Sequence, residues 1–89
     1  MYTPSETDAK KIEANFTYHA PLGNQLRRYE AIRRKAKELA QMPTEMCPAS
    51  RELSLALTHL EECVMWSNAS IARNEMSARE AFEDRAEGR

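Results

Sequence analysis

Glycine and long apolar runs are both scarce in this sequence of 89 residues. The two glycines, Gly23 and Gly88, lie far apart, so the glycine-rich loops that bind dinucleotides or nucleoside triphosphates cannot form. Apolar runs extend over only a few residues, and residues 1–6 lack the charged-then-apolar pattern of a secretory leader. We therefore expect neither a membrane span nor secretion.

Cysteine is also rare, and the two cysteines, Cys47 and Cys63, lack the spacing of a metal site. We expect both thiols to be reduced. His59 precedes Cys63 by four residues, but no third group completes a catalytic set, so we interpret His59 as a helix-surface residue. Because recognisable catalytic motifs are missing as well, the sequence predicts a protein without metal, cofactor or enzymatic activity.

Charge is balanced overall but unevenly distributed. The sequence has 13 Lys and Arg residues and 14 Asp and Glu residues, which gives a net charge of −1. Residues 22–42 contain six basic and two acidic residues, so this segment carries a charge of +4. Such a segment fits a localised anion site on an acidic body, although a solvated helix face is the commoner explanation.

Apolar periodicity predicts an all-α single domain over residues 1–89. The first long helix is expected over 22–41, ended by a loop from Pro43 to Pro48. Ser50 is the expected cap of a second helix over 50–75 or beyond. Residues 1–15 form a polar extension or a short helix, and residues 76–89 form a charged tail. The stripe of the first helix comprises Leu22, Leu26, Tyr29, Ile32, Ala36, Leu39 and Ala40.

The second predicted helix has two apolar faces. One face contains Leu53, Leu57, Leu60, Val64 and Ile71, and the other contains Leu55, Met65, Trp66, Ala69, Ala72 and Met76. A single partner helix covers only one of them. We therefore expect self-association through Trp66, Leu55, Met65, Ala69 and Met76, although another protein could cover the same face.

Aromatic and basic residues suggest a ligand. Phe16, Tyr18 and His19 precede the basic helix, and such a pairing suits nucleobase stacking and phosphate binding, although a hydrophobic staple is the commoner explanation of such aromatics. Arg33 borders the apolar stripe, where it either snorkels, pairs with a carboxylate or binds an anion. Arg73 follows Trp66 by one heptad and could bind an anion shared between subunits.

Two sequence blocks carry a family resemblance. They are Phe16-Thr17-Tyr18-His19-x-Pro21 with Gln25, Arg28-Tyr29, Ile32-Arg33 and Ala36-Lys37, and Cys47-Pro48-x-Ser50-Arg51-Glu52 with Ser54-Leu55-Ala56, Leu60-Glu61-Glu62, Met65-Trp66-Ser67-Asn68-Ala69 and Ile71-Ala72-Arg73-Asn74-Glu75. In this order they resemble the small phage anti-CBASS sponge family, which sequesters cyclic oligonucleotide signals. The resemblance covers residues 16–75 and leaves the N-terminal extension and the tail unassigned.

The resemblance implies a non-catalytic homohexamer, built from a short N-terminal helix and a long antiparallel helical hairpin. Its expected ligands are cyclic dinucleotides and cyclic trinucleotides, bound in the cytoplasm of the infected bacterial host, so that immune effectors are not activated. Neither a membrane nor a nucleic-acid polymer is an expected partner. The implied dinucleotide site contains Tyr18, which stacks on a base, and Arg33, which faces a phosphate, with His19 and Phe16. The implied trinucleotide site contains Arg73, at a threefold junction, and Lys35.

Two other functions remain open on the sequence. A nucleic-acid-binding or regulatory helical oligomer would use the +4 segment on phosphate backbones, and its binding would weaken steeply with salt. An enzyme that hydrolyses the same cyclic signals would release a linear product.

Overall fold

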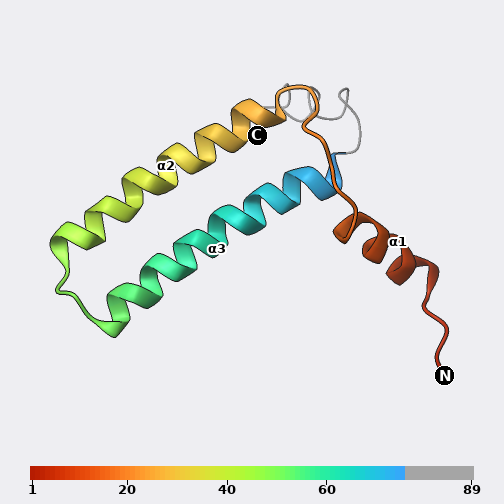
Figure 1. The fold of residues 1–89 in the computed structure, drawn as a ribbon, viewed down its shortest axis with the longest axis horizontal. Coiled ribbons are helices and arrows are strands. Elements are labelled where there is room, and N and C mark those ends of the chain that lie inside the picture. The colour runs from red at the N-terminus through yellow and green to blue at the C-terminus, as the bar shows by residue number, and fades with distance from the viewer. Residues whose placement is uncertain (76–89) are drawn as a thin grey trace.

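The computed structural model describes residues 1–75, which form three α-helices: α1 (Glu6–Asn15), α2 (Gln25–Met46) and α3 (Arg51–Asn74). These residues contain no strand, which confirms the all-α prediction for this part of the chain. Helices α2 and α3 lie side by side and antiparallel, and α1 lies beyond the open end of this hairpin (Figure 1). The predicted charged tail, 76–89, and the predicted interface residue Met76 lie outside the described residues.

Residues 1–15 were expected to form either a polar extension or a short helix, and helix α1 shows that most of them are helical. Ser5 caps it, because the Ser5 hydroxyl accepts a hydrogen bond from the Asp8 amide at 3.0 Å. Glu6 and Asp8 in the first turn place negative charge at the positive end of the helix dipole. Both features are local, so the start of α1 depends on residues within its first turn.

Helix α2 begins three residues later than predicted. Leu22, Gly23 and Asn24 form a turn in which the Gln25 amide donates to the Leu22 carbonyl at 2.9 Å. Gly23 has a φ of 52°, which a residue without a side chain adopts at no steric cost. The Gln25 side-chain oxygen then accepts from the Leu22 amide at 2.8 Å. The apolar stripe predicted a helix from Leu22, but this turn delays its start.

The predicted end of this helix was wrong. Helix α2 continues past residue 41 through Pro43 and ends at Met46, so the connecting segment is 47–50 rather than a loop from Pro43. Proline removes one backbone donor inside a helix. The next turn nevertheless closes, because the Cys47 amide donates to the Pro43 carbonyl at 2.9 Å and the Thr44 hydroxyl donates to the Ala40 carbonyl at 2.9 Å. Pro43 is also half-buried, so packing favours its helical position.

Helix α3 begins where the cap predicted it. The Ser50 hydroxyl accepts from the Leu53 amide at 3.1 Å. The first predicted face of this helix is half-buried along the hairpin, and it consists of Leu53, Leu57, Leu60, Val64 and Ile71. The helix ends at Asn74, where the Glu75 amide donates to the Ile71 carbonyl.

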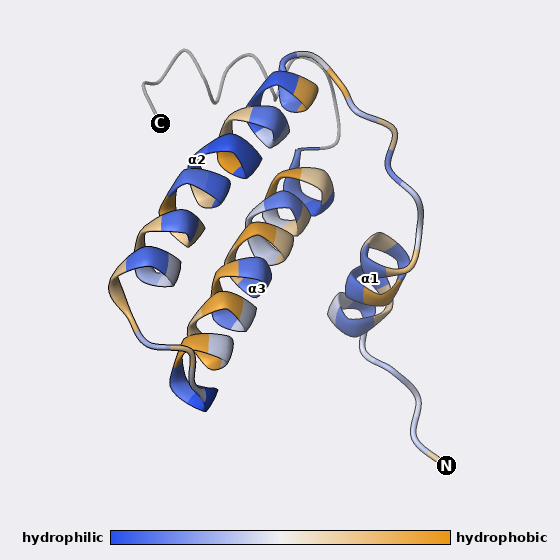
Figure 2. Cartoon of the chain, turned by 60° about the vertical axis from the view of Figure 1, so that its left-hand side comes forward, coloured by the Kyte–Doolittle hydropathy of each residue, from blue (hydrophilic) through white to orange (hydrophobic). Residues whose placement is uncertain are grey.

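Apolar burial within the described chain is slight. Its only buried residues are two polar ones, Asn24 and Gln25. On the second predicted face of α3, Leu55 is 41%, Met65 52% and Trp66 57% exposed. Apolar residues are distributed along α3, whereas α2 shows mainly hydrophilic residues (Figure 2). A hairpin with so little apolar burial has a weak driving force for folding on its own.

Candidate nucleotide-binding site

The open end of the hairpin is held by polar contacts that we term the open-end junction: Asn24, Gln25, Arg28 and Glu75. The Arg28 guanidinium makes a two-pronged ion pair with Glu75, in which Nη1 lies 2.9 Å from Oε2 and Nη2 contacts Oε1. The Gln25 amide nitrogen donates to the Glu75 backbone carbonyl and to its carboxylate, each at 3.2 Å. Arg28 Nε also donates to Asn24 Oδ1 at 3.0 Å. The start of α2 is thereby fixed against the end of α3.

The segment between α1 and α2 is held against α1 by His19. Its Nε2 donates to the Ala14 carbonyl at 2.7 Å, in the last turn of α1. Tyr18, the preceding residue, is 84% exposed. An exposed aromatic ring next to an anchored residue is available for stacking at little conformational cost. His19 therefore fixes the segment between α1 and α2, and the Tyr18 ring of that segment is exposed.

A groove lies where this segment meets the two long helices. We term it the tyrosine groove, and its volume is about 430 Å³, within the range of small-molecule sites, about 300–1,000 Å³. It is lined by Ala14, Asn15, Thr17, Tyr18, His19, Leu26, Tyr29, Arg33, Asn68, Ala69, Ala72 and Arg73. Four residues singled out in the sequence, Tyr18, His19, Arg33 and Arg73, thus share one groove, although the sequence assigned Arg73 to a separate site.

The two arginines of the tyrosine groove give it positive charge. Among residues 1–75, neither Arg33 nor Arg73 forms a salt bridge with a carboxylate. The Arg73 guanidinium lies over the Trp66 ring, 5.8 Å from its centroid. A cation held against an aromatic face keeps its N–H groups available for an anion. Two such cations beside an exposed tyrosine suit a ligand with both phosphates and bases.

Sequence reasoning did not assign Tyr29 or Asn68 to this site. Burial, followed by the nearby Glu75 carboxylate, raises the pKa of Tyr29 above its usual value, and Arg28 opposes this shift. The phenol therefore stays protonated and can donate a hydrogen bond. Asn68 Oδ1 is buried and has no hydrogen-bond partner among the described residues. Residue spacing did not point to either residue as part of a site, because Tyr29 of α2 and Asn68 of α3 meet only in the groove that the folded chain forms.

A second groove separates α1 from α3. We term it the lysine groove, and its volume is about 540 Å³. Its lining residues are Thr7, Lys10, Lys11, Ala14, Asn15, Trp66, Ala69, Ser70, Arg73 and Asn74. Part of the predicted association face of α3, namely Trp66 and Ala69, thus faces α1 of the same chain. Ala14, Asn15, Ala69 and Arg73 line both grooves, so the lysine and tyrosine grooves meet at Arg73.

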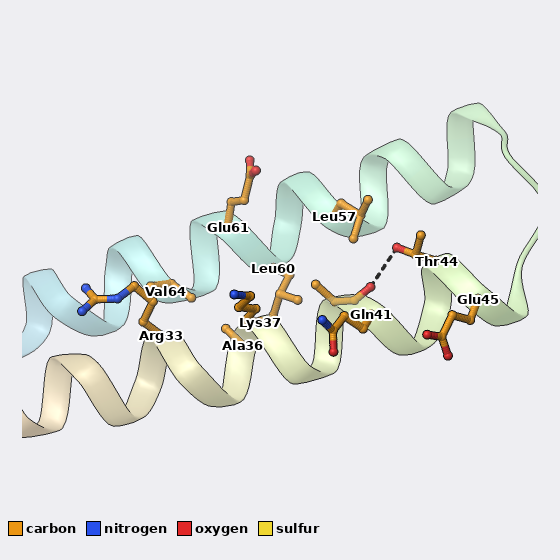
Figure 3. Close-up of a pocket in the computed structure, with 11 residues that line it drawn as sticks. Arg33, Ala36, Lys37, Gln41, Thr44, Glu45, Leu57, Leu60, Glu61 and Val64 are labelled. Carbon is orange, nitrogen blue, oxygen red and sulfur yellow. Dashed lines mark hydrogen bonds between the residues drawn. The ribbon is translucent and has the colours of Figure 1, made fainter.

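A third groove, of about 730 Å³, follows the hairpin toward its closed end. In Figure 3, Leu60 and Val64 are directed from α3 toward α2, while Glu61 points away from α2. Arg33 lies at the end nearer the tyrosine groove and contributes to both. We term this the interhelical groove; its floor is mainly apolar, which suits a protein partner better than a phosphate.

Two predicted site residues do not reach these grooves within one chain. Phe16 is exposed at the end of α1, and Lys35 pairs with Glu38 at 3.4 Å on the exposed side of α2. Their roles stay predictions. His59 lies 3.6 Å from Glu62 on the surface of α3, where Cys63 is also exposed. Within residues 1–75, no cluster of metal-ligating side chains occurs, and no helix combines the length and apolarity of a membrane span.

The described chain is thus a small α-helical hairpin domain with aromatic and cationic residues gathered at its open end. The family model described as Acb2/Tad1, hairpin domain, matches residues 8–72. The chain belongs to this family, the anti-CBASS cyclic oligonucleotide sponges, which confirms the family predicted from the sequence. The match begins within α1, so part of the N-terminal extension belongs to the domain as well. Searches of curated proteins and of solved structures gave no match.

Proposed function

We propose that this protein is a non-catalytic sponge that sequesters cyclic dinucleotides and cyclic trinucleotides. In the cytoplasm of an infected bacterium it would lower the free signal below the level that activates anti-phage effectors. The observation that carries the proposal is the tyrosine groove, in which the exposed Tyr18 lies with Arg33 and Arg73, two arginines without a carboxylate partner in residues 1–75. Membership of the sponge family supports the class of ligand.

Each groove residue has a chemical role in this proposal. Tyr18 stacks on a base, and Arg33 and Arg73 bind phosphates through charged hydrogen bonds. The protonated Tyr29 donates to a phosphate or base, and Asn68 Oδ1 accepts from an exocyclic amine. His19 holds Tyr18 in place. Phe16 and Lys35 act on ligand bound with a neighbouring subunit, because one chain does not bring them into the groove.

Assembly is the second part of the proposal. No apolar side chain is buried among residues 1–75, and Leu55, Met65 and Trp66 are exposed. A homo-oligomer, with a hexamer expected from the family, would cover these residues together with the interhelical groove. Ala69 and Met76 are the remaining predicted interface residues. The mass measured by light scattering at micromolar concentration tests this part, and a monomer would contradict it.

Calorimetry against a panel of cyclic dinucleotides and cyclic trinucleotides tests the ligand. We expect binding with a shallow dependence on salt, and recovery of the intact cyclic compound after the protein is denatured. No binding to any member of the panel would overturn the proposal. A linear product in the chromatogram would instead identify a phosphodiesterase, and tight, strongly salt-dependent binding to polynucleotides would identify a nucleic-acid-binding protein.

A further inference from the structure

Gln25 is the most deeply buried of residues 1–75, with 2% of its surface exposed. A buried amide is destabilising unless its donor and acceptor groups find partners. The Gln25 side-chain oxygen accepts from the Leu22 amide at 2.8 Å, and its nitrogen donates to the Glu75 carbonyl and carboxylate, each at 3.2 Å. An apolar side chain would serve packing alone, so these bonds indicate a residue that holds particular segments in place.

The two partners of Gln25 belong to different walls of the tyrosine groove. Leu22 lies in the segment between α1 and α2, which carries Tyr18. Glu75, which is 50 residues from Gln25 along the chain, directly follows the last turn of α3, which carries Arg73. Gln25 therefore connects the wall that carries the exposed aromatic ring to the wall that carries a cation.

The other anchor of the segment between α1 and α2 does not make this connection. His19 ties the segment to the last turn of α1. Helix α1 lies beyond the open end of the hairpin, whereas Arg33 and Arg73 belong to α2 and α3 (Figure 1). A segment tied to α1 alone would shift with α1 relative to both arginines. The bond between Gln25 and Leu22 restricts this movement, because it fixes the segment to the hairpin.

Gln25 itself lies outside the tyrosine groove, whose lining does not include it. It lines a smaller cavity of about 210 Å³ together with Glu75. Tyr18, His19 and Ala72 line both the cavity and the groove. Gln25 can therefore affect a ligand in the tyrosine groove only through the residues of this shared wall.

We infer that Gln25 is a positioning residue for cyclic dinucleotides, whose amide holds Tyr18 in the place relative to Arg33 and Arg73 that one ligand requires. The inference rests on the proposed function. A cyclic dinucleotide is a closed ring, so the distances between its bases and phosphates vary little. Stacking and phosphate binding must then be satisfied together, and a displacement of about 1 Å in one contact weakens the whole set.

The first test compares the two glutamines of α2 in the full chain. Gln25→Met keeps an unbranched side chain and removes all three bonds, and Gln41→Met makes the same change at an exposed position. By calorimetry with the cyclic dinucleotide that the parent binds best, we expect Gln25→Met to bind about tenfold more weakly and Gln41→Met to stay within about twofold of the parent. Circular dichroism and light scattering check the folding and mass of each variant.

A double-mutant cycle with Tyr18→Ala separates positioning from a general loss of stability. If Gln25 acts through the tyrosine ring, Gln25→Met should weaken binding by no more than about twofold once the ring is absent. A purely structural role gives the same fold-loss in both backgrounds. The inference is overturned if Gln25→Met binds as the parent does, if its loss is equal in both backgrounds, or if Gln41→Met loses as much.

An exchange of side chains keeps the test decisive if Gln25→Met does not fold. Gln25→Glu keeps an acceptor for the Leu22 amide but places a second carboxylate against Glu75, and Gln25→Glu/Glu75→Gln again places a donor opposite an acceptor. We expect the single variant to bind about tenfold more weakly and the exchange to recover to within about threefold of the parent. A folded exchange variant without recovery, or unfolding of every Gln25 variant, would overturn the inference. A parent that binds no cyclic dinucleotide would instead overturn the proposed function.

Discussion

The two ends of the helical hairpin are held together by different kinds of contact. At the closed end, residues 47–50 join α2 to α3, and the Ser50 hydroxyl bonds only to Pro48 and Leu53 nearby. At the open end, Glu75 bonds to Gln25 and Arg28, which precede it by 50 and 47 residues. The closed end is therefore defined locally, whereas the open end exists only after α2 and α3 have come together.

This difference explains where the candidate site lies. Three segments converge at the open end: α1 with its following segment, the first half of α2 and the last turns of α3. Convergence brings Tyr18, Arg33 and Arg73 to one groove from distant positions in the chain. The closed end offers two helices alone, and the groove between them is mainly apolar. We therefore propose that ligand binding depends on the open end and that the interhelical groove serves assembly.

The largest expected effect comes from breaking the proposed self-association through α3. Trp66→Glu places a charge on the exposed apolar face of α3 and should dissociate the oligomer, with loss of ligand binding where subunits share a pocket. Light scattering and calorimetry measure the two effects. Thr58→Glu adds the same charge to an exposed position on α3 and should leave the mass unchanged. An oligomer of parent mass in Trp66→Glu would contradict the prediction.

The next largest effect compares how much a carboxylate at the open end and one nearer the closed end contribute to stability. Glu75→Ala removes the largely buried carboxylate that pairs with Arg28 and should lower the free energy of unfolding by about 2–3 kcal/mol. The control is Glu62→Ala, which removes an exposed carboxylate beside His59 nearer the closed end and should cost about 0–1 kcal/mol. Urea denaturation followed by circular dichroism measures both. Equal losses would show that the open-end junction has no special contribution to stability.

A smaller effect concerns the ligand alone. Tyr18→Ala should weaken cyclic dinucleotide binding by about 1–3 kcal/mol for each stacked base, because the exposed ring is removed. Tyr18→Phe keeps the ring and should bind nearly as the parent does. Since Tyr18 is exposed in the described chain, the thermal stability of both variants should match that of the parent. Equal binding by Tyr18→Ala would exclude stacking on this residue.

The smallest effect distinguishes function from stability within the tyrosine groove. Asn68→Leu removes a buried oxygen that has no partner among residues 1–75, so the free energy of unfolding should stay equal or rise by about 1 kcal/mol. Ligand affinity should fall by about 1 kcal/mol, because a hydrogen bond to the base is lost. Thermal melting and calorimetry on the same samples check the two signs. A variant that loses stability instead would show that Asn68 supports the fold.

The local features of the fold were predictable from the sequence. Ser50 caps α3 where expected, and the half-buried face of α3 consists of the residues that the apolar spacing selected. Caps and helical periodicity depend on residues within one or two turns, which a sequence displays directly. The end of α2 was not predictable in this way. Pro43 favours a helix end locally, but hydrogen bonds and packing around it carry the helix on to Met46.

The sequence by itself determined the family, the presence of the two long helices and the choice of Tyr18, Arg33 and Arg73 as candidate residues, because motif order, periodicity and residue chemistry are visible along the chain. Only the tertiary structure decided that these three residues share a groove, that Asn68 and Tyr29 join them, and that α1 brings two lysines to Arg73. The physical reason is the open-end junction. A contact between Glu75 and the start of α2 leaves no periodic signal in either segment, yet it determines which side chains meet.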